Sequence, residues 1–168
     1  MGLRRATERV LFGVGSGIAS TVYGTIVVMA ALTAAYATER HPWKLAVVVF
    51  STAFVLWLAH LYSHGLSESI VENRRLTGAE LRAIVRRELG ILTAAVAPTT
   101  ALVLGAVGIF RESTAVWLAL GAGLLTLGVE GVRFARLERL GRSATAVVVG
   151  ANLALGCLVV AMKAALSH

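Results

Sequence analysis

The feature that most constrains this chain is a set of five long intervals without a charged residue, at residues 10–38, 45–67, 89–110, 113–129 and 143–162. An α-helix of about 20 mostly apolar residues crosses the hydrocarbon core of a bilayer, and four of the intervals reach that length. The fourth interval, with 17 residues, is at the lower limit. Because a backbone in lipid must satisfy its own hydrogen bonds, such intervals are expected to be helical.

The sequence therefore predicts an all-α, polytopic membrane bundle of five transmembrane helices in one domain, residues 1–168. Composition agrees, since 57% of the residues are hydrophobic, 15% are charged and the mean hydropathy is +0.79. We expect spans at about 10–38, 45–67, 89–110, 113–133 and 143–165. A further amphipathic helix is expected at about 77–88.

Catalytic motifs are sparse in this sequence. It contains no Asp, no G-x-S-x-G nucleophile turn and only one H-x-x-x-H box, whereas a membrane di-iron oxygenase needs several histidine clusters. We therefore expect a protein that is not an enzyme.

Basic residues are unevenly divided between the two ends of the predicted spans. With five spans, twelve Lys and Arg residues fall on one side and four on the other, which predicts a cytoplasmic N-terminus and an outside C-terminus. The twelve are Arg4, Arg5, Arg9, Arg74, Arg75, Arg82, Arg86, Arg87, Arg133, Arg136, Arg139 and Arg142; the four are Arg40, Lys44, Arg111 and Lys163.

The net charge of +7 follows mostly from this topology, with attraction to anionic lipid as an addition. Nucleic acid is not an expected partner, because the basic residues are split among short loops. Arginine outnumbers lysine fourteen to two, a composition that suggests a bacterial plasma membrane as the location.

A polar segment separates the second and third predicted spans. Thr77 is a candidate N-cap, and Glu80 stands at the position that completes a capping box. Leu81, Ile84, Val85 and Leu89 then share one face of the predicted helix. Such a helix can lie at the membrane surface or pack against a partner protein.

Glycines are abundant inside the spans. Gly13 and Gly17 form a G-x-x-x-G pair in the first span, which predicts close packing with another helix. Five helices of this length enclose little space, so we expect a homo-oligomer.

The segment AHLYSHGLSESIVE, residues 59–72, places two histidines and two glutamates four residues apart. Four residues of a helix rise about 6 Å, so only two successive side chains of this series can bind the same metal ion. His60, His64 and Glu68 are candidate ligands for a divalent metal ion, and Glu130, Glu8 or Glu88 could complete the site. The alternative is that the histidines mark the membrane interface and the glutamates are solvated.

Other polar residues within the spans are candidates for lining a pathway. Ser16, Ser20, Thr21 and Tyr23 give the first span a polar side, unless they bond to carbonyl groups of their own helix. Asn152 in the fifth span either contributes to the pathway or joins two helices. Glu130 has a structural alternative as well, an ion pair with Arg133 at i,i+3. These residues are candidates because a polar group in hydrocarbon is costly unless it faces protein or water.

The stretch GVGSGIAST, residues 13–21, resembles the first-span pattern G-x-x-D-G-[IL]-x-S-T of the vacuolar iron transporter family. The predicted five spans, with the N-terminus inside and a cytoplasmic segment after the second span, are similar too. The resemblance implies a homodimer with a metal and proton path along the first span. Ser16 stands where that family has its metal-binding Asp, and the second span offers His60, His64 and Glu68 in place of the family's Met and Gly-Glu-Tyr.

Two functions are consistent with these observations. One is a small cation transporter or channel, with metal ions as cargo and a His/Glu site near the inner face. The other is a non-catalytic membrane scaffold or accessory subunit that binds partner helices.

Overall fold

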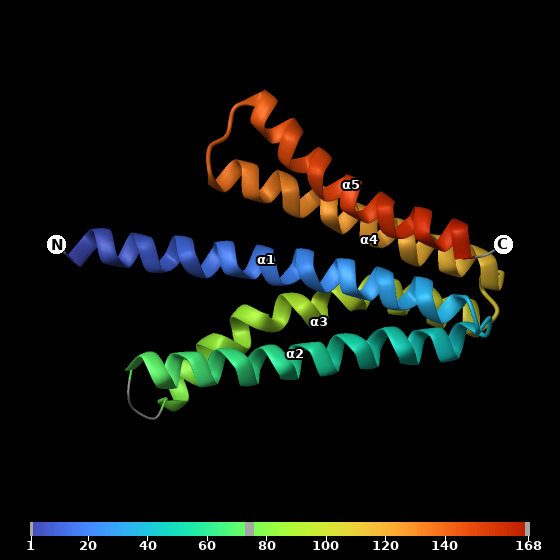
Figure 1. Ribbon diagram of the computed structural model, residues 1–168, viewed down its shortest axis with the longest axis horizontal. Coiled ribbons are helices and arrows are strands. Elements are labelled where there is room, and N and C mark those ends of the chain that lie inside the picture. Colours follow the sequence, from blue (N-terminus) through green and yellow to red (C-terminus); the bar gives the residue numbers. More distant parts are fainter. Residues whose placement is uncertain (1, 73–75, 167–168) are drawn as a thin grey trace.

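The computed structural model of the chain describes residues 2–72 and 76–166, and the side chains of residues 17–70, 76–162 and 165. This part consists of the helices α1 (Gly2–Tyr36), α2 (Pro42–Glu72), α3 (Gly78–Ala106), α4 (Glu112–Leu137) and α5 (Arg142–Leu166) (Figure 1). All five are long and apolar enough to cross a membrane. The predicted all-helical fold with five candidate spans is therefore confirmed.

The helices extend beyond the charge-free intervals. The fourth interval, at the lower limit in the sequence, belongs to a helix of 26 residues. This helix continues through Glu130, whose carboxylate accepts a hydrogen bond of 2.7 Å from Arg133 one turn later. The Glu130–Arg133 pair expected from the sequence is therefore present.

The expected amphipathic helix at 77–88 is not a separate element, since these residues form the start of α3. The predicted capping box is present: Thr77 N donates to Glu80 Oε2 at 2.8 Å, and Glu80 N donates to Thr77 Oγ1 at 3.4 Å. Of the predicted apolar face, Ile84 is buried in the bundle, whereas Leu81 and Leu89 are exposed on its outer surface. The buried stripe instead runs through Ile84, Glu88 and Ile91.

The first helix is the centre of the bundle and packs against each of the other four. The α2–α3 hairpin lies on one side of it and the α4–α5 hairpin on the other, and the two hairpin connections diverge at the end where the chain begins (Figure 1). α5 packs against α1 and α4 and has no contact with α2 or α3 among the described residues.

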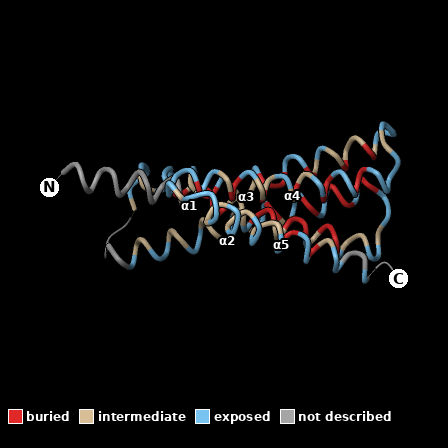
Figure 2. Tube along the Cα trace, turned by 90° about the horizontal axis from the view of Figure 1, so that it is seen from above, coloured by how far each residue is buried: buried red, intermediate tan, exposed pale blue. Residues whose placement is uncertain are grey.

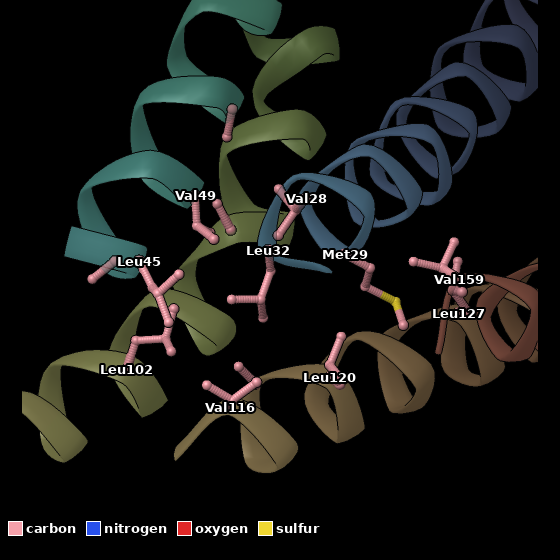
Figure 3. Packing of buried hydrophobic residues seen from close by; sticks show 14 residues of the cluster. Val28, Met29, Leu32, Leu45, Val49, Leu102, Val116, Leu120, Leu127 and Val159 are labelled. Atoms are coloured by element: carbon pink, nitrogen blue, oxygen red, sulfur yellow. The ribbon is translucent and has the colours of Figure 1, made fainter. Parts of the chain in front are cut away.

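The apolar core lies toward the opposite end of the bundle (Figure 2). Side chains from all five helices meet there: Val28, Met29 and Leu32 of α1, Leu45 and Val49 of α2, Leu102 of α3, Val116 and Leu120 of α4, and Val159 of α5 (Figure 3). Both short connections, between α1 and α2 and between α3 and α4, are at this end. We call this end of the bundle the core end. The end that carries the α2–α3 and α4–α5 connections is called the open end.

The connection between α1 and α2 carries its own polar structure at the core end. Glu39 Oε1 accepts hydrogen bonds from the backbone N–H groups of Arg40 and His41, both at 3.0 Å. Lys44 Nζ donates to Glu39 Oε2 at 2.7 Å and is the main cause that lowers the pKa of this carboxyl, with the His41 N–H second. The carboxylate thus holds the turn before α2, and His41 Nδ1 accepts a hydrogen bond of 3.3 Å from Trp43 N at the start of that helix.

Glycines bring α1 and α3 into backbone contact toward the open end. A Cβ atom added at Gly24 would lie 2.8 Å from Ile91 Cα, and one added at Gly90 would lie 2.6 Å from Thr21 Oγ1 and 2.9 Å from the Gly17 carbonyl oxygen. A Cβ on Gly17 would meet nothing within 4 Å. Within the chain, Gly24 and Gly90 make the close α1–α3 contact, whereas the Cβ side of Gly17 is open, and the surroundings of Gly13 lie outside the described side chains.

Replacement of Gly90 tests this contact. Gly90→Ala should lower the melting temperature in detergent, because the new methyl group overpacks the α1–α3 contact at a cost of about 1–3 kcal/mol. Gly121→Ala is the matched control, since a Cβ at Gly121 meets nothing within 4 Å. Alanine is the better helix former, so the control should be neutral or slightly stabilising. Equal melting temperatures for the two variants would contradict the contact.

Candidate functional site

Glu88 is a buried carboxylate between three of the helices. It projects from α3, and only 2% of its side chain is exposed. Ser20 Oγ of α1 donates a hydrogen bond to Oε2 at 2.7 Å, and Arg87 Nε donates to Oε1 at 3.1 Å. His64 Nε2 of α2 lies 3.5 Å from the same Oε1. Each carboxylate oxygen therefore has a partner, as a buried charge requires.

Local sequence explains why Glu88 is buried. Ile84 and Ile91 are spaced at i−4 and i+3 from Glu88, so the three side chains share the face of α3 that points into the bundle. Ser20 and Gly24 are likewise one turn apart on α1. The close contact of Gly24 and Gly90 with the opposite helix brings this face of α1 against α3, which places the Ser20 hydroxyl on the carboxylate.

Arg87 connects two carboxylates. Besides its contact with Glu88, its Nη1 lies 3.5 Å from Glu68 Oε1 on α2. The Arg87 side chain is 26% exposed and that of Glu68 is 38% exposed, so the ion pair lies at the edge of the buried region. One guanidinium group thus compensates part of the negative charge of two glutamates.

These groups line an open pocket of about 520 Å³ between α1, α2 and α3. His60 and His64 contribute from α2, with ring centroids 6.2 Å apart, and Tyr23 of α1 stacks at an angle on His60 at 5.2 Å. His60 Nδ1 lies 3.1 Å from the Leu56 carbonyl oxygen, which can only accept. In the neutral ring the proton is therefore on Nδ1, and Nε2 keeps a free lone pair.

The structure brings together five residues that the sequence predicted for the site, namely Ser20, Tyr23, His60, His64 and Glu68. Thr21 is not among them. Its hydroxyl donates to the Gly17 carbonyl oxygen at 3.0 Å within the same helix, the alternative considered for polar residues of this span. The side chains of Ser16, Glu8 and Glu72 lie outside the described residues.

Glu130 does not join this pocket. It belongs to α4, which packs on the other side of α1, and is 5% exposed. Oε1 accepts from Arg133, whereas Oε2 is buried and has no hydrogen-bond partner among the described residues. No group of three or more His, Cys, Asp or Glu side chains suited to a metal ion occurs in the described part of the chain. The expected set of His60, His64, Glu68 and Glu130 is therefore not assembled within one protomer.

Asn152 joins two helices and does not line the pocket. Its Nδ2 donates to the Leu127 carbonyl oxygen at 3.2 Å, which ties α5 to α4. Gly131 lies opposite, where an added Cβ would be 3.2 Å from that same nitrogen. The pathway role predicted for Asn152 gives way to the alternative, a contact between helices.

From the sequence alone, neither Arg87 nor Glu88 is expected at the centre of this pocket. Arg87 is named from the sequence only among the basic residues that predict the orientation, and Glu88 only as one of several residues that could complete the metal site. The periodicity of Ile84, Glu88 and Ile91 was the available signal, because a glutamate between isoleucines at helical spacing lies on the buried face.

Comparison with protein-family models, with curated proteins and with solved structures finds no match to this chain.

Removal of the Ser20 hydroxyl tests the geometry around Glu88. Ser20→Ala leaves Oε2 without its donor, and a hydrogen bond to a charged group contributes about 1.5–3 kcal/mol. We expect a lower melting temperature than for the parent chain. Ser51→Ala, on the exposed face of α2, is the control and should leave it unchanged. In the Glu88→Leu background Ser20→Ala should have little effect; a full additional loss there would show that the hydroxyl acts elsewhere.

Proposed function

We propose that this protein is a small cation transporter whose internal binding group is Glu88. The observation that carries the proposal is the buried carboxylate of Glu88, held by Ser20 and Arg87 on the wall of an open pocket within membrane-spanning helices. A buried ionisable group in a helix long enough to cross a membrane is costly, and such groups commonly mark ion or proton pathways.

The charge of the pocket favours a cation as cargo. Glu68 and Glu88 bring two negative charges and Arg87 one positive charge, so with neutral histidines the pocket has one uncompensated negative charge. Carboxylate oxygens and the free Nε2 of His60 are suitable ligands for a metal cation. His64 and Glu88, 3.5 Å apart, form a two-ligand element, which a second protomer or water would have to complete.

Arg87 gives the proposed mechanism its switch. Its guanidinium group occupies the space between Glu68 and Glu88 that an incoming cation would take. Because the side chain is partly exposed, it can turn outward while the cation takes over both carboxylates. During binding and release the Arg87 guanidinium and the metal cation replace each other, so the buried carboxylate always has a cationic partner.

The resemblance of the first helix to vacuolar iron transporters points to the same cargo class and to a homodimer. In this proposal Glu88 and the histidines of α2 take the place of the Asp that is replaced by Ser16. A bacterial plasma membrane remains the proposed location.

Flux through proteoliposomes tests the role of Glu88. Glu88→Gln keeps the shape and can still accept from Ser20, but it removes the charge that binds the cation. We expect uptake of Fe²⁺, Mn²⁺ or Zn²⁺ to fall to the level of protein-free liposomes. Glu138→Gln, an exposed glutamate just beyond α4, is the matched control and should retain uptake.

Two outcomes would overturn the proposal. One is equal uptake by the parent chain and Glu88→Gln; the other is unchanged metal binding and uptake after combined His60→Ala and His64→Ala. The variant Arg87→Gln tests whether Arg87 competes with the cation or only stabilises the fold. It should raise cation affinity by removing the internal competitor, whereas a purely structural Arg87 would only lower the melting temperature.

A scaffold function is the second candidate, and open glycine faces favour it. A Cβ at Gly17, Gly121 or Gly150 would meet nothing within 4 Å, so these bare helix surfaces are available to partner helices. Co-purification of a stoichiometric partner protein, together with no uptake by the isolated chain, would favour this function over transport.

Orientation is the remaining part of the proposal. The arginine distribution places the α1–α2 connection outside and the α4–α5 connection inside. In a Cys157→Ala background, Thr38→Cys should react with a membrane-impermeant maleimide on intact cells. Gly141→Cys should react only after permeabilisation. Both positions are exposed, so the reverse pattern would show the opposite orientation.

A further inference from the structure

A second pocket lies between α4 and α5, away from the Glu88 pocket. It measures about 630 Å³, within the range of about 300–1,000 Å³ typical of ligand sites. Its wall is almost wholly apolar, built from Leu124, Leu125, Val129, Val149 and Leu153. Gly128 adds bare backbone between them. We call this pocket the α4–α5 groove.

Two arginines close one end of the α4–α5 groove. Arg133 and Arg136 belong to the last two turns of α4, at the open end of the bundle. Arg133 also donates to Glu130, but its side chain is 56% exposed. Arg136 is exposed and has no carboxylate partner among the described residues. The groove thus combines an apolar body with a cationic rim.

We propose that the α4–α5 groove binds an anionic phospholipid, with the phosphate on Arg136 and Arg133 and an acyl chain along the apolar wall. Guanidinium groups match phosphate oxygens in geometry and charge, and basic pockets between transmembrane helices bind anionic headgroups. From Arg133 to Leu124 the wall extends about 14 Å along α4, from the headgroup level into the hydrocarbon.

The surroundings favour a lipid over a polypeptide as occupant. The wall presents almost no polar group that could fix a peptide or a partner's side chains, and its one charged feature lies where α4 ends. An acyl chain needs only apolar contact, while Arg136 supplies the specificity for a negative headgroup. This site shares no lining residue with the Glu88 pocket, so it does not depend on the transport proposal.

Native mass spectrometry of the full chain in detergent tests the site. The chain is titrated with phosphatidylglycerol and, in parallel, with phosphatidylcholine of the same acyl chains. We expect preferential retention of phosphatidylglycerol. Arg136→Gln should weaken it about fivefold, the factor that corresponds to about 1 kcal/mol per basic residue. Arg86→Gln, an exposed arginine of α3 outside the groove, should leave retention unchanged.

Two tryptophan variants and a competition with inorganic phosphate distinguish the possible ligands of the groove. Val129→Trp fills the groove from an exposed position and should abolish the preference, whereas Leu118→Trp, exposed on α4 outside the groove, should not. Inorganic phosphate at the same concentration should not displace the lipid, because it lacks the acyl chain. The proposal is overturned if both lipids are retained equally, or if Arg136→Gln and Arg86→Gln behave alike. A dimer that Val129→Trp dissociates would overturn it too, since a second copy would then fill the groove.

Discussion

The backbone contact between α1 and α3 determines where the polar groups of this bundle lie. Gly24 and Gly90 let the two helices approach until no Cβ atom fits between them. Only at that separation does the Ser20 hydroxyl reach Glu88 at 2.7 Å. Wider spacing would leave the buried carboxylate without one of its donors, which costs about 1.5–3 kcal/mol. Helix packing and the chemistry of the pocket therefore depend on the same two glycines.

The first helix lies between two buried glutamates, Glu88 and Glu130, which the sequence allows as ligands of one metal site. Glu88 faces it from the α2–α3 hairpin and Glu130 belongs to the α4–α5 hairpin on the other side. Each glutamate has an arginine nearby in its own helix, at i−1 for Glu88 and at i+3 for Glu130. Each acidic residue thus has its own arginine partner, although Glu88 shares Arg87 with Glu68. A metal site that used both would require a different arrangement of the two hairpins.

Sequence reasoning recovered the helices but only part of the pocket. Charge-free length determines a span, so all five were predictable, and the Thr77 capping box depends only on neighbouring residues. His60, His64 and Glu68 share one helix, and their common face follows from the helical period. Which residues of another helix meet them depends on the crossing of α1 with α3, and no local pattern encodes it. Hence the sequence offers Glu130, Glu8 and Glu88 alike as residues that could complete the site, and it does not show that Arg87 pairs with two of the glutamates.

The uneven distribution of apolar packing has a mechanical consequence. The large buried side chains join the helices at the core end, whereas the hairpins diverge at the other end, where polar contacts predominate. A helix of 31 residues such as α2 is about 46 Å long, so a tilt of about 5° about the core end moves its far end by about 4 Å. Glu88 of the same hairpin accepts a hydrogen bond of 2.7 Å from Ser20 of α1. A small rotation of the α2–α3 hairpin against α1 is therefore enough to make or break the hydrogen bond that holds the buried carboxylate.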